Sequence, residues 1–329
     1  MIATQEICDR TALATGQSLG ALARRKFTKS TRGVVAVLLV ALVGANCLNI
    51  AADLMAIGQG MELVHAGPAP VWAALGGIGI TLILAFGSFE IIGSVFKWLC
   101  MALLAYCGVL VAVHLNWAEV LRGMTAQHLQ FTPAYFALLV AVLGTSISPY
   151  LFFWQSAHRI EELRAEELGG DAAPALKHRS KRAAERKLRH SRIDVFAGMA
   201  FSVLIMFAII AATAATLGVH GTTLNSAADA AKALEPVAGN ASGLLFAVGF
   251  IGSGILAVPV LAASGSAGMA GLLNKKWGLD HSPRKAPFFY GLLIVGLVAG
   301  TILSIVDADA IGLLILSALV NGIARGPFL

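Results

Sequence analysis

The chain has 329 residues, of which 57% are hydrophobic and only 13% are charged, and its mean hydropathy is +0.79. Soluble domains contain about 45–50% apolar and about 25% charged residues, so this composition excludes an ordinary soluble enzyme, a disordered chain and a disulfide scaffold. The net charge of +6 does not indicate nucleic-acid binding, because the basic residues lie between apolar runs, where they would meet anionic lipid headgroups. The class that remains is a polytopic membrane protein.

Long apolar runs predict an all-α fold with one transmembrane domain over residues 1–329. A helix needs about 20 mostly apolar residues to cross a bilayer, and the runs are continuous rather than alternating, which indicates helices. Eight segments are long enough, and a more polar segment at 1–24 is expected to form a partial N-terminal helix. The expected spans lie at about 33–56, 69–87, 91–115, 132–157, 194–217, 242–272, 286–306 and 308–324.

The distribution of basic residues predicts the orientation. If the segment before the first span is cytoplasmic, the loops on that side hold nearly all of the Lys and Arg residues, and the outer loops hold only Arg122 and Lys232. This bias predicts a multi-pass membrane protein with its basic loops in the cytoplasm. The polar segment 158–193 is then a cytoplasmic loop, expected to form two short solvated helices against anionic lipid. A regulatory or partner-binding role for this loop stays open.

Three polar residues share one face of the first span. Asn46, Asn49 and Asp53 are spaced i, i+3 and i+7, which places them on the same side of a helix. Polar groups in a span are costly and usually functional, so these residues are candidates to line an ion or proton path. The alternative is that they hold helices together through interhelical hydrogen bonds.

The fourth span contains a helix-breaking motif, Gly144-Thr145-Ser146-Ile147-Ser148-Pro149. Proline removes a backbone donor and clashes with the preceding turn, so carbonyl groups around Thr145 and Ser146 should be freed. Discontinuous helices of secondary transporters present such oxygens to cations. The alternative is a plain proline kink whose carbonyls are satisfied by serine hydroxyls. Ser317 and Asn321, spaced i, i+4 in the last span, are candidates for further oxygen donors.

The spans contain no paired carboxylates and no Ser-His-Asp or Cys-His arrangement of the kind that catalysis needs. The sequence therefore predicts neither an enzyme nor a resident cofactor. Cys8, Cys47, Cys100 and Cys107 lack C-x-x-C spacing and are expected to be reduced thiols.

These motifs resemble the NRAMP family of divalent metal transporters, particularly its bacterial NRAMP-related branches. The family's sixth helix carries a motif of the type G-A-T-x-M-P-H, which is similar to the segment 144–150 here. Ser148 then stands at the metal-binding methionine, Tyr150 at the histidine, and Thr145 at the residue whose carbonyl is a ligand. The third-helix pattern A-T-D-L-A-E resembles residues 51–56, which keep Asp53 and replace the glutamate by Ala56.

The resemblance implies a LeuT-like inverted-repeat bundle in a bacterial inner (plasma) membrane that moves Mn²⁺, Mg²⁺ or Fe²⁺ by alternating access. It implies Thr145 and Ser148 as metal ligands, with contributions from Ser317 and Asn321. Tyr150 would lie near the gate, and Asp53, with Asn46 and Asn49, would line the path. An all-oxygen site suits Mg²⁺ or Mn²⁺, and Ala56 implies weak or absent coupling to protons.

Two other functions stay open at this stage. The family's first helix carries an Asp-Pro-Gly motif that this sequence does not contain, so the chain is expected to lack that helix and the family's C-terminal end. A non-transporting fragment of such a transporter is therefore one alternative. The other is a transporter of the same fold that carries an organic substrate.

Overall fold

The computed structural model describes residues 2–86, 117–125, 131–146, 148–166, 169–170, 173–216, 239, 242–306 and 310–324. All regular secondary structure within these residues is helical, and six stretches of helix in this part of the chain are long and apolar enough to cross a membrane. The prediction of an all-α polytopic membrane protein is thereby confirmed. The inverted-repeat arrangement stays a prediction. The expected span at 91–115 lies outside the described residues.

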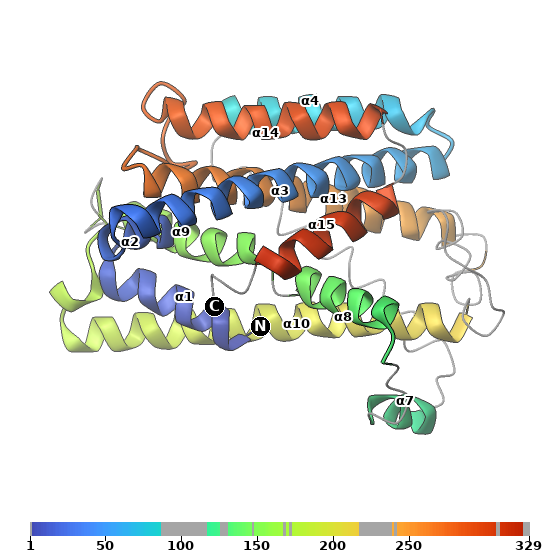
Figure 1. Cartoon of the computed structure of the whole chain (residues 1–329), viewed down its shortest axis with the longest axis horizontal. Helices are drawn as coiled ribbons and strands as arrows, with labels where there is room; N and C mark the ends of the chain where they lie inside the picture. The colour runs from blue at the N-terminus through green and yellow to red at the C-terminus, as the bar shows by residue number, and fades with distance from the viewer. Residues whose placement is uncertain are drawn as a thin grey trace.

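The described helices overlap the predicted segments but differ from them at their ends (Figure 1). Of the predicted spans that the structure describes, 132–157 is divided between two helices, the helix that contains 194–217 begins earlier, at Lys181, and the first span is longer at both ends than expected. Thr28 caps the longer helix by accepting a hydrogen bond from the Thr31 backbone N–H. The elements are α1 (Ile2–Thr15), α2 (Leu19–Lys26), α3 (Lys29–Leu63), α4 (Ala69–Phe86), α7 (Trp117–Met124), α8 (Pro133–Ser146), α9 (Pro149–Ala165), the 3₁₀ turn η2 (Leu176–His178), α10 (Lys181–Thr216), α13 (Ser242–Leu272), α14 (Pro287–Val306) and α15 (Ala310–Ala324).

The N-terminal segment forms two helices rather than the single partial helix expected at 1–24. Gly16 separates α1 from α2 with φ +66°, a left-handed conformation that glycine adopts without strain. The Gly16 N–H donates to the Ala12 carbonyl at 2.8 Å, which closes the last turn of α1. A Cβ on Gly16 would lie 2.5 Å from the Ala173 carbonyl oxygen, so the turn also sets how closely α1 meets the segment after α9.

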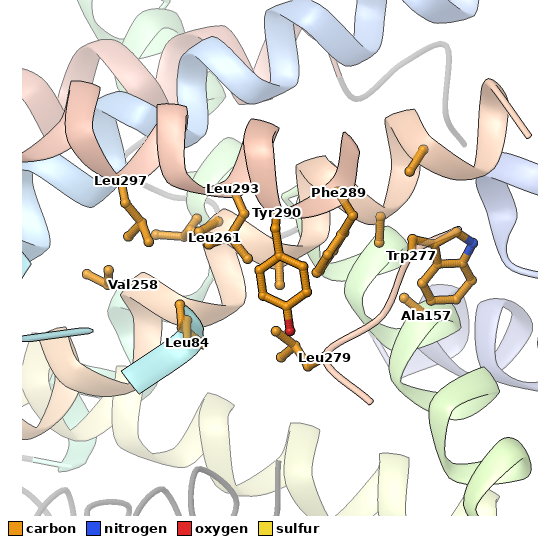
Figure 2. Close-up of a cluster of buried hydrophobic side chains, with 14 of the residues drawn as sticks. Leu84, Ala157, Val258, Leu261, Trp277, Leu279, Phe289, Tyr290, Leu293 and Leu297 are labelled. Atoms are coloured by element: carbon orange, nitrogen blue, oxygen red, sulfur yellow. The ribbon is translucent and has the colours of Figure 1, made fainter. Parts of the chain in front are cut away.

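Helix α3 is the centre of the bundle, because α4, α13, α14 and α15 all pack against it. Figure 1 shows α3 running between the α4–α14 layer and the layer that contains α8, α9 and α15. The largest buried cluster joins α3, α4, α9, α13 and α14 with the segment between α13 and α14. Figure 2 shows part of it, with Leu293 and Leu297 from α14 near Leu261 and Val258 from α13, and Phe289 further along α14 toward Ala157 and Trp277.

The polar segment 158–193 differs from the two short solvated helices that were expected. Its first part continues α9 to Ala165, and its last part begins the 36-residue α10. Arg159 and Glu161 are only 5% exposed, and Leu163 is fully buried. This part of the segment is thus an interior interface rather than a solvated loop, because α1 packs against both α9 and α10.

Candidate metal-transport site

The fourth predicted span is broken at the position that the sequence indicates. Helix α8 ends at Ser146, and α9 begins at Pro149, which occupies the first turn, where no N–H is needed. Ser148 is the N-cap residue of α9, with an extended backbone at φ −76° and ψ 137°. Its side chain is 2% exposed. The break therefore lies inside the protein rather than on a solvated surface.

Local hydroxyl groups satisfy part of the freed backbone. The Ser148 hydroxyl donates to the Gly144 carbonyl and lies 3.3 Å from the Thr145 carbonyl. The Thr145 hydroxyl donates back to the Ala141 carbonyl at 3.1 Å, as expected for Thr in a helix. These contacts resemble the serine-satisfied kink that the sequence left open. A carbonyl oxygen has two lone pairs, and a hydroxyl that rotates away exposes its oxygen, so the same groups can also bind a cation.

A close crossing with α15 fixes the end of α8. A Cβ on Gly144 would lie 2.0 Å from the Ala318 carbonyl oxygen and 2.7 Å from the Gly322 nitrogen. A Cβ on Gly322 would in turn lie 2.7 Å from the Val140 carbonyl oxygen. Glycine on both helices thus allows backbone to approach backbone, as in small-residue interfaces between membrane helices. This crossing brings the turn of α15 that contains the predicted oxygen donors next to the break.

Two of the predicted polar side chains meet across α3 and α15. The Ser317 hydroxyl donates to the Asn49 side-chain carbonyl, and Ser317 is 1% exposed. One turn further along α15, Asn321 is also 1% exposed, and its side-chain oxygen is buried without a hydrogen-bond partner. An unsatisfied buried acceptor costs about 1–3 kcal/mol, which a bound cation would offset.

The other three predicted residues have different surroundings. The Asn46 amide donates to the Leu261 carbonyl at 2.9 Å and to the Ser264 hydroxyl at 3.2 Å. Asn46 therefore ties α3 to α13 in this structure, although its own side-chain oxygen is unpaired. Asp53 lies within electrostatic reach of Tyr150, which links α3 to the first turn of α9.

Among the described residues, no cluster of three or more His, Cys, Asp or Glu side chains is placed to hold a metal ion. The donors that lie around the break are carbonyl, hydroxyl and amide oxygens, which are the ligands that hard divalent cations prefer. Asp53 is the nearby acidic group identified from the sequence.

Comparison with known proteins identifies the family. The family described as "Natural resistance-associated macrophage protein-like" (Nramp) matches residues 1–328. The chain belongs to the Nramp family. The resemblance seen in the two short motifs is therefore confirmed across the whole chain.

Two bacterial relatives of this Nramp chain have the same name, "Divalent metal cation transporter MntH". The protein from Agrobacterium fabrum is 24% identical over 287 residues, which cover 84% of this chain and 58% of the relative. The protein from Deinococcus radiodurans is 29% identical over 143 residues, which cover 42% of this chain and 29% of the relative. In both comparisons the chain spans less than two thirds of the relative's length.

The structure also contains a buried ion-pair network that the sequence analysis missed. The Arg159 Nε donates to the Asp9 Oδ1 at 2.6 Å, and Asp9 is fully buried. Gln155 on α9 donates to the same Asp9 oxygen at 3.0 Å, and Ser191 on α10 donates to the other. The network joins α1, α9 and α10 in this Nramp chain, on the half-helix that follows the break.

Charged groups next to this network continue it toward the surface. Lys187 on α10 pairs with Glu162 and, at 2.8 Å, with Glu166. Burial alone would raise the pKa of Glu166, but hydrogen bonds from Lys187 and Arg179 hold this pKa below its usual value. On α1, burial and the neighbouring Asp9 charge raise the pKa of the Cys8 thiol to about 11.

The opposite side of α9 is fastened to the segment between α13 and α14. The Glu161 carboxylate accepts a hydrogen bond from the Leu279 N–H at 2.7 Å. The Arg164 guanidinium donates to the Trp277 carbonyl at 3.0 Å and lies 4.6 Å from the centre of the Trp277 ring.

Proposed function

We propose that this chain carries a divalent metal cation of the Mn²⁺, Mg²⁺ or Fe²⁺ class across the membrane by alternating access. The observation that carries the proposal is the buried helix break at Ser148, next to the polar side chains of α3 and α15. Membership of the Nramp family and the printed names of two relatives support it. The protein is thus a transporter rather than an enzyme, in the inner membrane of a bacterium with its basic loops in the cytoplasm.

Each residue near the break has a defined role in this proposal. The Thr145 carbonyl and the Ser148 oxygen bind the metal ion, after the Ser148 hydroxyl rotates away from the Gly144 carbonyl. Asn321 offers its unpaired side-chain oxygen, and Ser317 positions Asn49. Because carbonyl, hydroxyl and amide oxygens are hard ligands, the site selects Mg²⁺ or Mn²⁺ over softer metals.

Transport is weakly coupled, or not coupled, to protons. The family's third-helix glutamate is replaced by Ala56, which cannot take up a proton. Asp53 remains on the same helix and lies near Tyr150, so it lines the metal path. Proteoliposomes that contain a pH-sensitive dye measure the coupling directly. Mn²⁺ uptake without a matching acidification is the expected result, and a fixed proton-to-metal ratio would contradict this part of the proposal.

Metal binding is tested by calorimetry on the purified chain with Mn²⁺ and with Mg²⁺. Ser148→Ala is expected to weaken binding about tenfold, because it removes one oxygen ligand to a charged species. Ser146→Ala is the matched control, since its hydroxyl donates to the Val142 carbonyl at 2.7 Å and also contacts the Met206 sulfur on α10, away from the proposed site.

Three results would count against the metal site. Unchanged affinity in Ser148→Ala would remove Ser148 from the ligand set. Equal losses in both serine variants would indicate a general loss of structure rather than a lost ligand. A chain that folds but binds neither metal would overturn metal transport by this protein, and a non-transporting role would replace it.

A further inference from the structure

The turn between α2 and α3 holds a group of basic residues without acidic partners. Its members, here called the basic elbow, are Arg24, Arg25, Lys26, Lys29 and Arg32. The sequence has no Asp or Glu between Asp9 and Asp53. No member of the basic elbow forms an ion pair with any residue that the structure describes, and the buried Arg24 Nε has no hydrogen-bond partner within the described part of the chain.

Some of the basic residues of α10 and its approach are different in this respect. Lys187 pairs with two glutamates, Arg192 pairs with Glu6, and Arg179 pairs with Glu166. Both regions are rich in basic residues, but among the described residues the α10 region has acidic partners for three of its cations, whereas the basic elbow has none. An uncompensated cluster of this kind next to a membrane span attracts anions from the lipid surface.

An apolar groove of about 480 Å³ opens beside the basic elbow, between α2, α3 and α9. Its walls include Ala23 from α2 and Val34 and Leu38 from α3, and its floor is formed by Phe152 and Phe153 from α9, which are 2% and 4% exposed. Lys26, at the end of α2, lines the groove itself. The groove therefore combines a hydrocarbon-lined interior with a cationic edge.

We propose that this groove binds one acyl chain of an anionic phospholipid, whose phosphate lies on the basic elbow. A phospholipid supplies both required chemistries in one molecule, because its chain fills apolar space and its phosphate neutralises the unpaired cations. On α3 the groove lining runs from Thr31 into the apolar stretch at Val34 and Leu38, so the basic elbow lies at the end of the groove where a headgroup would be. The free N–H groups at the start of α3 add a further attraction for the phosphate. The proposal concerns α2, α3 and α9, and it stands independently of metal transport.

Native mass spectrometry of the full chain, released from a neutral detergent, tests the proposal. The probes are phosphatidylglycerol and phosphatidylcholine with identical acyl chains, so that only the headgroup charge differs. We expect the chain to prefer phosphatidylglycerol by about tenfold or more, since each Lys or Arg near a lipid headgroup contributes roughly a fivefold preference. The variant Arg25→Gln/Lys26→Gln/Lys29→Gln should bind both lipids alike. A variant with Lys181, Arg182 and Arg186 replaced by Gln removes the same charge from exposed positions on α10 and should keep the preference.

A second pair of variants tests the groove rather than the charge. Val34→Phe fills the groove and should weaken the binding of both lipids, whereas Val37→Phe makes the same change at a 69% exposed position of α3 outside the groove and should have no effect.

Several outcomes would overturn the proposal. They are equal affinities of the native chain for the two lipids, an equal loss of preference in the α10 variant, and identical behaviour of Val34→Phe and Val37→Phe. A dimer that dissociates in Val34→Phe would mean that a second copy of the chain occupies the groove, which also overturns it.

Discussion

Gly144→Ala tests whether the crossing of α8 and α15 positions the proposed metal site. The added Cβ would lie 2.0 Å from the Ala318 carbonyl oxygen, whereas real Cβ contacts stay above 3.0 Å. The obstacle is backbone, which has no rotamer to change, so the two helices must separate by about 1 Å at this point. Thr145 is the next residue, and its carbonyl moves with the end of α8.

The effect of Gly144→Ala on the free energy of unfolding has two opposing parts. Alanine in a helix is favoured over glycine by about 0.5–1 kcal/mol, but forcing a methyl group into a close-packed contact costs about 1–3 kcal/mol. We therefore expect a net loss of about 1–2 kcal/mol in the free energy of unfolding. Gly144→Ala should weaken metal binding more than it lowers the free energy of unfolding. The reason is that a shift of about 1 Å exceeds the tolerance of about 0.2 Å on metal–ligand distances.

Thermal unfolding in detergent and calorimetric Mn²⁺ titration measure the two effects. Gly44→Ala on α3 is the matched control, since a Cβ there meets no atom within 4 Å, and it should stabilise the protein slightly without changing affinity. If Gly144→Ala were as stable as the control and bound Mn²⁺ with unchanged affinity, the role assigned to the α8–α15 crossing would be refuted.

Other predictions concern the ion-pair network around α9. Asp9→Ala should cost about 1–3 kcal/mol, because it removes the fully buried partner of the Arg159 guanidinium, which keeps its pairs with the more exposed Glu162 and Asp194; replacing both residues by apolar ones should cost clearly less in the same unfolding assay, and an equal cost would contradict a paired charge. Cys8, whose pKa is raised to about 11 by burial and by the Asp9 charge, should resist alkylation at pH 8 until the chain unfolds, as measured in a variant whose other cysteines are serine. Glu166→Gln should destabilise the protein at pH 7, because the lowered pKa of Glu166 contributes stability that is present above the unfolded value near 4.5 and is lost as the pH falls through the folded value. The difference between Glu166→Gln and the native chain should therefore vanish in acid, and a difference that persists there would contradict the hydrogen bonds from Lys187.

Local features of the sequence predicted the position of the helix break because its cause is local. Pro149 lacks a backbone donor wherever it stands in a helix, so the carbonyls before it are freed whatever surrounds them. The neighbouring side chains determine which groups donate hydrogen bonds to those carbonyls. In the structure the Ser148 hydroxyl donates to the Gly144 carbonyl, a contact that the sequence presented only as one of two alternatives.

The polar face of the first span shows the same division. The spacing of Asn46, Asn49 and Asp53 fixes their shared face, but an amide that holds helices together has the same sequence pattern as one that lines a path. In the structure both amides form interhelical hydrogen bonds, but with different partners: Asn46 donates to α13, and Asn49 accepts from Ser317 on α15. Which neighbour each residue meets depends on the packing of helices that are more than 200 residues apart in the chain.

Composition and apolar run length alone determined that this protein is a helical, polytopic membrane protein, because each backbone polar group in a bilayer must be satisfied within its own helix. Two short motifs indicated the family, because helix breaks and intramembrane carboxylates are rare and costly enough to be distinctive. Only the tertiary structure decided that Asp9 meets Arg159 and that Gly144 contacts α15. Such contacts join segments that are distant in the chain, and the pattern of neither segment contains information about its partner.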